Sequence, residues 1–299
     1  MITIPYSYLV TLTLYGGYLM KHSLSIKSIA LVESLRPISS ILGLSGAYIG
    51  GIVAGAPYAS IQLLLATIVV FLIGGGSMAF NDYFDRDIDK ISHPLRPIPS
   101  KRLSAKEELY FSLILFGLGL LISAFINLVC FGLVLFSIAF LYGYEAYLKN
   151  YGFAGNIAVA FMSALSFTFG GAAVGKPFSS LVISLIVFFM FTGRETLKDV
   201  QDVKGDVLSR NTLPMRIGEK NAAIVGSIFL IIALIFSPLP YLLGQLKIYY
   251  LIFISLVDLI CLYAIRETLK DLRNTERSVG LIRTAAAIGV FAIIIGAIL

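Results

Sequence analysis

Long apolar runs separated by short polar segments follow one another along almost the whole chain. Each run is around 20 residues long, which is the length that a helix needs to span the hydrocarbon core of a bilayer. Hydropathy predicts nine such helices, near residues 29–55, 60–84, 107–127, 129–148, 154–175, 178–198, 221–243, 247–265 and 279–299. The pattern therefore predicts an all-α membrane protein, a bundle of nine transmembrane helices.

The first 22 residues differ from the rest of the chain. They are apolar, but Pro5, Gly16 and Gly17 interrupt them, and they lack the charged start of a signal peptide. We expect residues 1–22 to form an N-terminal leader or interfacial segment. Residues 23–299 then form a single nine-helix transmembrane domain.

The composition excludes an ordinary soluble domain. Apolar residues make up 58% of the chain and charged residues only 13%, against about 25% in soluble proteins. Cys130 and Cys261 both lie inside apolar runs, so no disulfide framework is implied. We attribute the net charge of +6 to the loops of a membrane protein and expect no nucleic acid partner.

Basic residues are distributed asymmetrically between the two sets of loops. Of the 23 lysines and arginines, only Lys176 and Lys247 lie on the side that follows the first, third, fifth and seventh helices. The positive-inside rule then predicts a cytoplasmic N-terminus and an external C-terminus in the cell membrane.

Two acidic stretches stand out at the predicted cytoplasmic ends of apolar helices. They run from Asn81 to Asp89 and from Glu195 to Asp206, and they hold eight of the 17 carboxylates of the chain. On a helix, Asn81, Asp85 and Asp89 share one stripe, and Asp82 lies beside it. The second stretch places its carboxylates within about 60° of one another, at Glu195, Asp199, Asp202 and Asp206. Like charges at this spacing repel, so a cation is expected to compensate them.

Several classes of protein carry carboxylates at a membrane surface. Cation or solute transporters usually place them near the middle of the bilayer, and a metallohydrolase would be expected to bring histidines, of which this chain has two. The landmark residues of CDP-alcohol phosphotransferases are missing. As an alternative without a functional role, the clustered carboxylates could be solvated caps at the helix ends. Magnesium takes oxygen ligands and is commonly shared between carboxylates and substrate phosphates, so the pattern favours activation of a diphosphate leaving group with Mg²⁺ as cofactor.

The first stretch resembles a known signature. Its Asn-Asp-x-x-Asp-x-x-x-Asp pattern, followed by His-Pro-Leu-Arg-Pro at residues 93–97, is similar to the first motif of the UbiA superfamily of intramembrane prenyltransferases. The second stretch looks like the second aspartate-rich motif of that family, about 115 residues later. Within the superfamily, residues 194–206 and the Thr-Leu-Pro at 212–214 most resemble the archaeal branch that adds a second geranylgeranyl chain to an ether lipid.

The resemblance implies a shared magnesium site at the cytoplasmic mouth. We expect first-choice ligands at Asn81, Asp85, Asp202 and Asp206, supported by Asp82, Asp89, Glu195 and Asp199. Asp82, Asp85 and Asp202 are the residues for which we expect a direct part in catalysis, and Asp82 and the departing diphosphate are the two candidates for taking the acceptor's proton.

The same resemblance assigns phosphate-binding residues. Cations match the family by position at Arg36, Arg96, Arg102, Lys149 and Lys198. Asn156 follows Lys149 at a spacing found in relatives, whereas the tyrosine that relatives often have four residues before this lysine is Glu145 here. Because Arg194 and Glu195 diverge by about 100° on a helix, Arg194 is expected to reach an acceptor headgroup while Glu195 serves the metal. Arg36, Arg96, Arg102 and Lys149 also have a simpler interpretation as topology charges.

The implied substrates are geranylgeranyl diphosphate and a phosphoglycerol lipid, whose free hydroxyl becomes an ether. An aromatic acceptor of quinone biosynthesis is the alternative within the enzymes, and a transporter is the alternative outside them. Asp258 lies inside an apolar run, where it is either functional or hydrogen-bonded to a neighbouring helix. Asp87 points away from Asp89 and is expected to pair with a lysine or arginine. The sequence does not indicate an oligomeric state.

Overall fold

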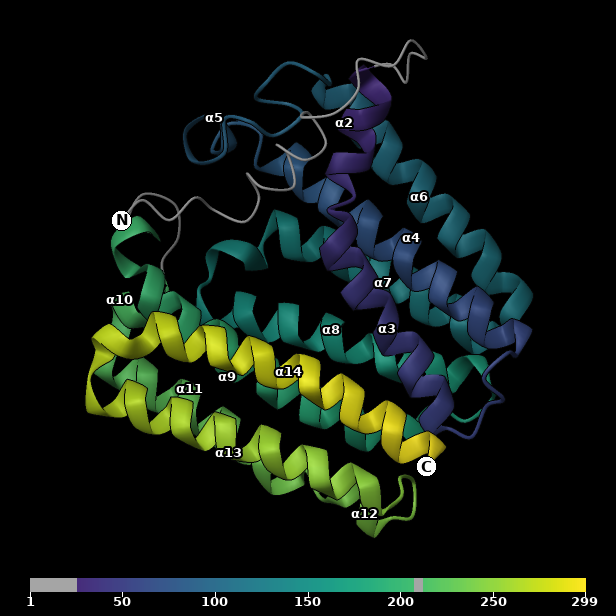
Figure 1. Ribbon diagram of the computed structural model, residues 1–299. Coiled ribbons are helices and arrows are strands. Elements are labelled where there is room, and N and C mark those ends of the chain that lie inside the picture. Colours follow the sequence, from purple (N-terminus) through teal and green to yellow (C-terminus); the bar gives the residue numbers. More distant parts are fainter. Residues whose placement is uncertain (1–25, 207–211) are drawn as a thin grey trace, which may run out of the picture.

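The computed structural model describes residues 26–206 and 212–299, and this part of the chain is helical without strands (Figure 1). Residues 1–25, which include the expected leader, and residues 207–211 lie outside it. The long helices are α3 (Pro37–Val53), α4 (Ile61–Phe84), α6 (Ala105–Ile126), α7 (Leu128–Ala146), α8 (Phe153–Ala173), α9 (Leu181–Asp206), α11 (Glu219–Phe236), α13 (Ile248–Lys270) and α14 (Thr275–Ile298). Shorter helices are α2 (Ile26–Ser34), α5 (Asp89–Ser92), α10 (Leu213–Ile217), α12 (Leu239–Leu242), η1 (Leu148–Asn150), η2 (Pro177–Ser180) and η3 (Leu272–Asn274).

The all-helical membrane fold is confirmed. In the described residues, eight segments are long and apolar enough to cross a membrane, and they match the second to the ninth predicted helices. The helix predicted over 221–243 is divided in the structure, because α11 ends before Pro238 and the short α12 follows it.

The first predicted helix, over 29–55, is wrong as a single element. It is broken into α2 and α3, and the apolar part of α3 covers only Gly43–Val53. Pro37 occupies the first turn of α3, and proline disfavours the α-helical region for the residue before it. Arg36 leaves the right-handed helical region and takes a left-handed conformation with φ 45°. The break places Arg36 at a corner between the two helices.

The long helices pack as a closed series. α6 packs on α4, α4 on α3, α3 on α8, α8 on α9 and α9 on α11, while α13 and α14 pair with each other and α14 contacts both α9 and α3. In Figure 1 the α5 loop lies at the end of the bundle opposite the C-terminus. The end of the first acidic stretch, where α5 begins at Asp89, therefore lies at the end of the bundle opposite the C-terminus.

Small residues allow α3 and α8 to approach closely. A Cβ atom added to Gly50 would overlap the carbonyl oxygen of Phe167, and one added to Gly170 would overlap the carbonyl oxygen of Ala47. Close backbone contact of this kind is how small residues associate helices in lipid, where no hydrophobic force drives them together. The α3–α8 contact therefore fixes Arg36, at the start of α3, relative to the helices that carry the acidic stretches.

Candidate active site

The first acidic stretch leaves the helix earlier than its stripe predicts. α4 ends at Phe84, where the predicted helix also ends, and Asp85 is its C-cap, so the stripe drawn through Asp89 does not lie on one continuous helix. The backbone still continues the helical hydrogen bonding for one turn, because the Asp85 amide donates to the Asn81 carbonyl and the Asp89 amide donates to the Asp85 carbonyl, each at 2.8 Å. The loop that then begins allows the four side chains to separate into two clusters.

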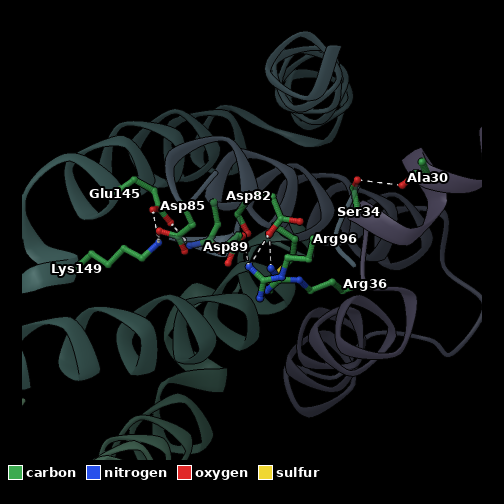
Figure 2. A network of polar contacts seen from close by, with 12 residues as sticks. Ala30, Ser34, Arg36, Asp82, Asp85, Asp89, Arg96, Glu145 and Lys149 are labelled. Atoms are coloured by element: carbon green, nitrogen blue, oxygen red, sulfur yellow. Dashed lines mark hydrogen bonds and ion pairs between the residues drawn. The ribbon is translucent and has the colours of Figure 1, made fainter. Parts of the chain in front are cut away.

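The first cluster, which we call the arginine cluster, consists of Asp82, Asp89, Arg36 and Arg96 (Figure 2). Arg36 donates to the Asp82 carboxylate, and one guanidinium nitrogen of Arg96 lies 3.3 Å from Asp82 and 2.6 Å from Asp89. Both carboxylates are buried, with side chains 4% exposed. Arg36 and Arg96 therefore compensate the buried charge of the two aspartates.

The second cluster, which we call the lysine cluster, consists of Asn81, Asp85, Glu145 and Lys149. The Lys149 ammonium lies 2.6 Å from Asp85 Oδ1 and 2.9 Å from Glu145 Oε2, and the Asn81 amide donates to Glu145 Oε1 at 2.9 Å. Glu145 comes from the last turn of α7 and Lys149 from η1, so the cluster ties these elements to the end of α4 (Figure 2). Lys149 is 7% exposed and lies between two carboxylates.

The second acidic stretch remains helical, as predicted. α9 runs through it without a break, so Glu195, Asp199 and Asp202 occupy neighbouring positions on one helix face. The Asn156 amide donates to Asp199 at 2.7 Å, and Lys198 lies 3.9 Å from Asp202. The backbone of Asp206 closes α9, but its side chain lies outside the described part of the structure.

Two arginines make contacts that the sequence did not predict. Arg194 does not diverge from Glu195: its guanidinium donates to the Glu195 carboxylate, because a long arginine side chain can fold back along the helix onto its neighbour. Arg102 binds Glu33 of α2 at 2.9 Å and the Leu95 carbonyl at 2.6 Å. It thereby holds the loop after α4 against α2, which is a structural role that its position in the sequence did not indicate.

A cavity of about 70 Å³ lies beside the second stretch. Six of the predicted site residues line it: Lys149, Asn156, Glu195, Lys198, Asp199 and Asp202. Because Lys149 also bonds Asp85, this lysine belongs both to the lysine cluster and to the wall that faces the second stretch. A larger hollow of about 350 Å³ lies beside Lys176 and contains none of the predicted site residues.

Comparison with known protein families identifies the family of this chain. The chain matches the UbiA prenyltransferase family over residues 43–297. The chain belongs to that family. It is therefore a prenyltransferase, and the transporter alternative is not supported.

Relatives within the UbiA family carry one specific name. The chain is 38% identical over 272 residues to the digeranylgeranylglyceryl phosphate synthase of Methanococcus maripaludis strain C6, covering 87% of this chain and 97% of the relative. It is 40% identical over 237 residues to the enzyme of that name from Methanosarcina mazei, covering 78% and 81%. These similarities confirm the resemblance to the archaeal branch.

Solved structures support the same fold. A structure reported for digeranylgeranylglyceryl phosphate synthase in membranes superposes with a TM-score of 0.81 at 31% identity, covering 91% of this chain and 99% of the other. A UbiA homologue from Archaeoglobus fulgidus bound to GPP and Mg²⁺ superposes with a TM-score of 0.71 at 20% identity, covering 89% and 98%. At that identity the second match bears on the fold alone.

The donor set fits a magnesium ion shared with a substrate. Around the cavity the acidic side chains of Glu195, Asp199 and Asp202 offer oxygen atoms, which are the donors that a hard cation prefers. Within residues 26–206 and 212–299, no three carboxylate, histidine or cysteine side chains converge closely enough to hold an ion by themselves. Magnesium commonly takes only one or two carboxylates together with substrate phosphates, so this sparse set is compatible with it.

Some site features were missed or left open by the sequence. Glu145 was noted only as a departure from relatives, although its spacing of four residues from Lys149 is a signal for a helical ion pair. Thr212 lines the cavity with a buried hydroxyl; the sequence marked it only as part of the resemblance at 212–214 and gave it no place in the site. Asp87 pairs with Lys90 at 2.7 Å, as predicted, and this hydrogen bond lowers the pKa of the Asp87 carboxyl. Asp258 accepts from Ser237 at 2.7 Å, which favours its structural interpretation.

Proposed function

We propose that the protein transfers a geranylgeranyl group from its diphosphate to the free hydroxyl of geranylgeranylglyceryl phosphate, with Mg²⁺ as cofactor. The observation that carries the proposal is the position of Lys149. It bonds Asp85 of the first acidic stretch at 2.6 Å and lines the same cavity as Asp199 and Asp202 of the second. A diphosphate between the two stretches would meet carboxylates for its counter-ions and an ammonium for its oxygens.

The archaeal relatives support the choice of acceptor. Relatives named digeranylgeranylglyceryl phosphate synthase match this chain at 35–40% identity over most of its length. A phosphoglycerol acceptor brings a second anionic headgroup to the site, and Arg194 and Lys198 beside the second stretch offer cations for it. An uncharged aromatic acceptor would have no use for this additional positive charge.

We assign one set of residues to the metal and another to the phosphate groups. Asn81, Asp85, Asp202 and Asp206 would hold magnesium, with Asp82, Asp89, Glu195 and Asp199 in support. The ion supplies positive charge that stabilises the departing diphosphate. Phosphate oxygens would be bound by Arg36, Arg96, Lys149 and Lys198, and Arg102 would support the loop that carries Arg96.

The reaction exchanges one carbon–oxygen bond for another. The allylic carbon loses its bond to diphosphate and gains a bond to the acceptor oxygen, whose proton must leave. Asp82 is 4% exposed and its carboxylate is already occupied by Arg36, with Arg96 close by, so it would have to give up a guanidinium partner to take the proton. We therefore favour the departing diphosphate as the group that takes the proton.

A substrate panel tests this function. Purified protein in detergent receives geranylgeranyl diphosphate, Mg²⁺ and either geranylgeranylglyceryl phosphate or an uncharged aromatic ring, and products are followed by mass spectrometry. We expect the ether product only with the phosphoglycerol lipid, and loss of turnover with EDTA. Efficient prenylation of the aromatic ring would replace the proposed acceptor, and full activity in EDTA would remove the metal.

We further propose that the active site faces the cytoplasm. The basic residues of the loops support this orientation, with Lys176 and Lys247 on the external side. Both native cysteines are buried, so they provide a silent background for labelling. Cysteines introduced in the 90–106 loop should react with an impermeant reagent only from the cytoplasm, and one near Lys176 only from outside. Labelling of both from one side would rule out the topology.

A further inference from the structure

Glu145 was not among the residues expected to bind metal or phosphate, but it lies at the centre of the lysine cluster. Its two oxygens have different partners: Oε1 accepts from the Asn81 amide and Oε2 accepts from Lys149, each at 2.9 Å. The side chain is only 5% exposed, so these hydrogen bonds are shielded from water. Glu145 thus joins an expected metal ligand to an expected diphosphate-binding residue.

The chemistry of this contact fixes the orientation of Asn81. A carboxylate accepts hydrogen bonds and cannot donate them, so only the NH₂ side of the asparagine amide can face Glu145. The amide oxygen must then face the other way. Only that oxygen can bind a hard cation, so the contact leaves Asn81 with its one useful donor atom free of Glu145.

The charge of Glu145 has a second effect. In the lysine cluster one ammonium faces two carboxylates, Asp85 at 2.6 Å and Glu145 at 2.9 Å, which leaves a net negative charge in a buried place. Without Glu145 the pair of Lys149 and Asp85 would be neutral. The extra carboxylate therefore favours entry of a divalent cation while it holds Lys149 beside the cavity.

We propose that Glu145 is a positioning residue of the prenyl-transfer site, which orients the Asn81 amide oxygen toward the metal and holds the Lys149 ammonium beside the diphosphate. This role rests on the proposed function. Neighbours that orient a metal ligand typically contribute 10- to 100-fold to metal affinity. We expect an effect of about that size on metal binding and a smaller one on the affinity for the acceptor.

The test measures binding without turnover. Detergent-solubilised protein is titrated with Mn²⁺ in the presence of inorganic diphosphate and without any acceptor, using calorimetry. Glu145→Gln should weaken Mn²⁺ binding by about 10- to 100-fold, because glutamine can donate to the Asn81 oxygen and turn the amide around. Glu276→Gln, an exposed change of the same kind at the start of α14, is the control and should bind like the wild type.

A reciprocal exchange separates positioning from folding. In Asn81→Asp two carboxylates face each other, whereas Asn81→Asp combined with Glu145→Gln restores a donor opposite an acceptor, now with the roles reversed. We expect the double variant to bind Mn²⁺ more tightly than Asn81→Asp alone. Mn²⁺ affinity of Glu145→Gln within twofold of the wild type, or no recovery in the double variant, would overturn the proposal. Because no acceptor is present, these results do not depend on which acceptor the enzyme uses.

Discussion

The two acidic stretches contain equal numbers of carboxylates but present them in different ways. In the first stretch the side chains of Asp82 and Asp89 are 4% exposed and that of Asp85 is 16% exposed, and each lies beside an arginine or lysine. In the second, Asp202 is 38% exposed and its nearest ammonium, that of Lys198, is 3.9 Å away. Three carboxylates of the first stretch are thus buried and compensated by the protein, whereas Asp202 of the second is more exposed and lines the cavity.

This difference indicates how the site is built. Buried carboxylates need partners, since an unpaired buried charge is strongly destabilising. The first stretch meets this need with Arg36, Arg96 and Lys149, which hold it in one arrangement before any ligand arrives. The second stretch keeps its carboxylates on a regular helix, where Arg194 binds Glu195 and Asn156 donates to Asp199, while Asp202 has a distant partner and is the carboxylate that can adapt to a ligand. Lys149 is the point where the two arrangements meet.

The largest effect is expected when either stretch loses a metal ligand. Asp85→Ala and Asp202→Ala should each lower kcat by on the order of 10³-fold or more, and the double variant should be no worse than either, because residues that act as a unit are non-additive. Steady-state assays of the three variants measure this. If the loss of kcat in the double variant equals the product of the two single losses, the two stretches act independently and form two separate sites.

Replacing one lysine beside each stretch compares how much each stretch depends on its cation for the free energy of unfolding. Lys149→Met removes the ammonium from two nearby carboxylates and should cost about 3–5 kcal/mol, since it leaves a buried charge uncompensated. Lys198→Met removes a half-exposed ammonium and should cost less than about 1 kcal/mol. Thermal unfolding in detergent compares the two. Equal losses would show that the first stretch is no more dependent on its own cations than the second.

Removal of Arg194 tests whether the cations of the second stretch are available to bind a substrate. Its guanidinium binds Glu195, and both side chains are 21% exposed, so it can exchange this partner for a phosphate. Arg194→Ala should raise the KM for the phosphorylated acceptor by roughly 10- to 150-fold, equivalent to about 1.5–3 kcal/mol, with a much smaller change for the prenyl donor. Lys220→Ala, an exposed change at the start of α11, is the control. Equal changes for both substrates would limit Arg194 to shielding Glu195.

The sequence predicted most of the fold because membrane spans depend on local hydrophobicity. Eight of the nine predicted helices have a counterpart, and α9 remains helical through the second stretch. The break at Arg36 was also encoded locally, since the proline that follows it disfavours a helix there, but the apolar residues on both sides obscured this signal.

The arrangement of the first stretch could not be predicted in the same way. Periodicity places Asn81 and Asp89 on one stripe, but tertiary contacts separate them, so that Asn81 faces Glu145 from α7 and Asp89 faces Arg96 from the following loop. These contacts depend on how α4 and α7 pack and on where the chain turns after Phe84. A single sequence contains the partners but does not specify which of them meet.

The smallest effect is expected behind the first stretch, at Glu108 in the first turns of α6. Its side chain is fully buried, and no hydrogen bond of good geometry reaches either carboxylate oxygen from residues 26–206 and 212–299, although the Ser34 hydroxyl lies nearby. Buried polar atoms without partners reduce stability, so an apolar side chain of similar volume should fit without loss. Glu108→Met should leave the unfolding free energy within about 1 kcal/mol of the wild type or raise it, as measured by thermal unfolding beside Glu145→Met, which loses two hydrogen bonds. A loss at Glu108 as large as that at Glu145 would mean that the charge of Glu108 helps to hold the arginine cluster, and the compensation of the first stretch would then extend one layer deeper into the bundle.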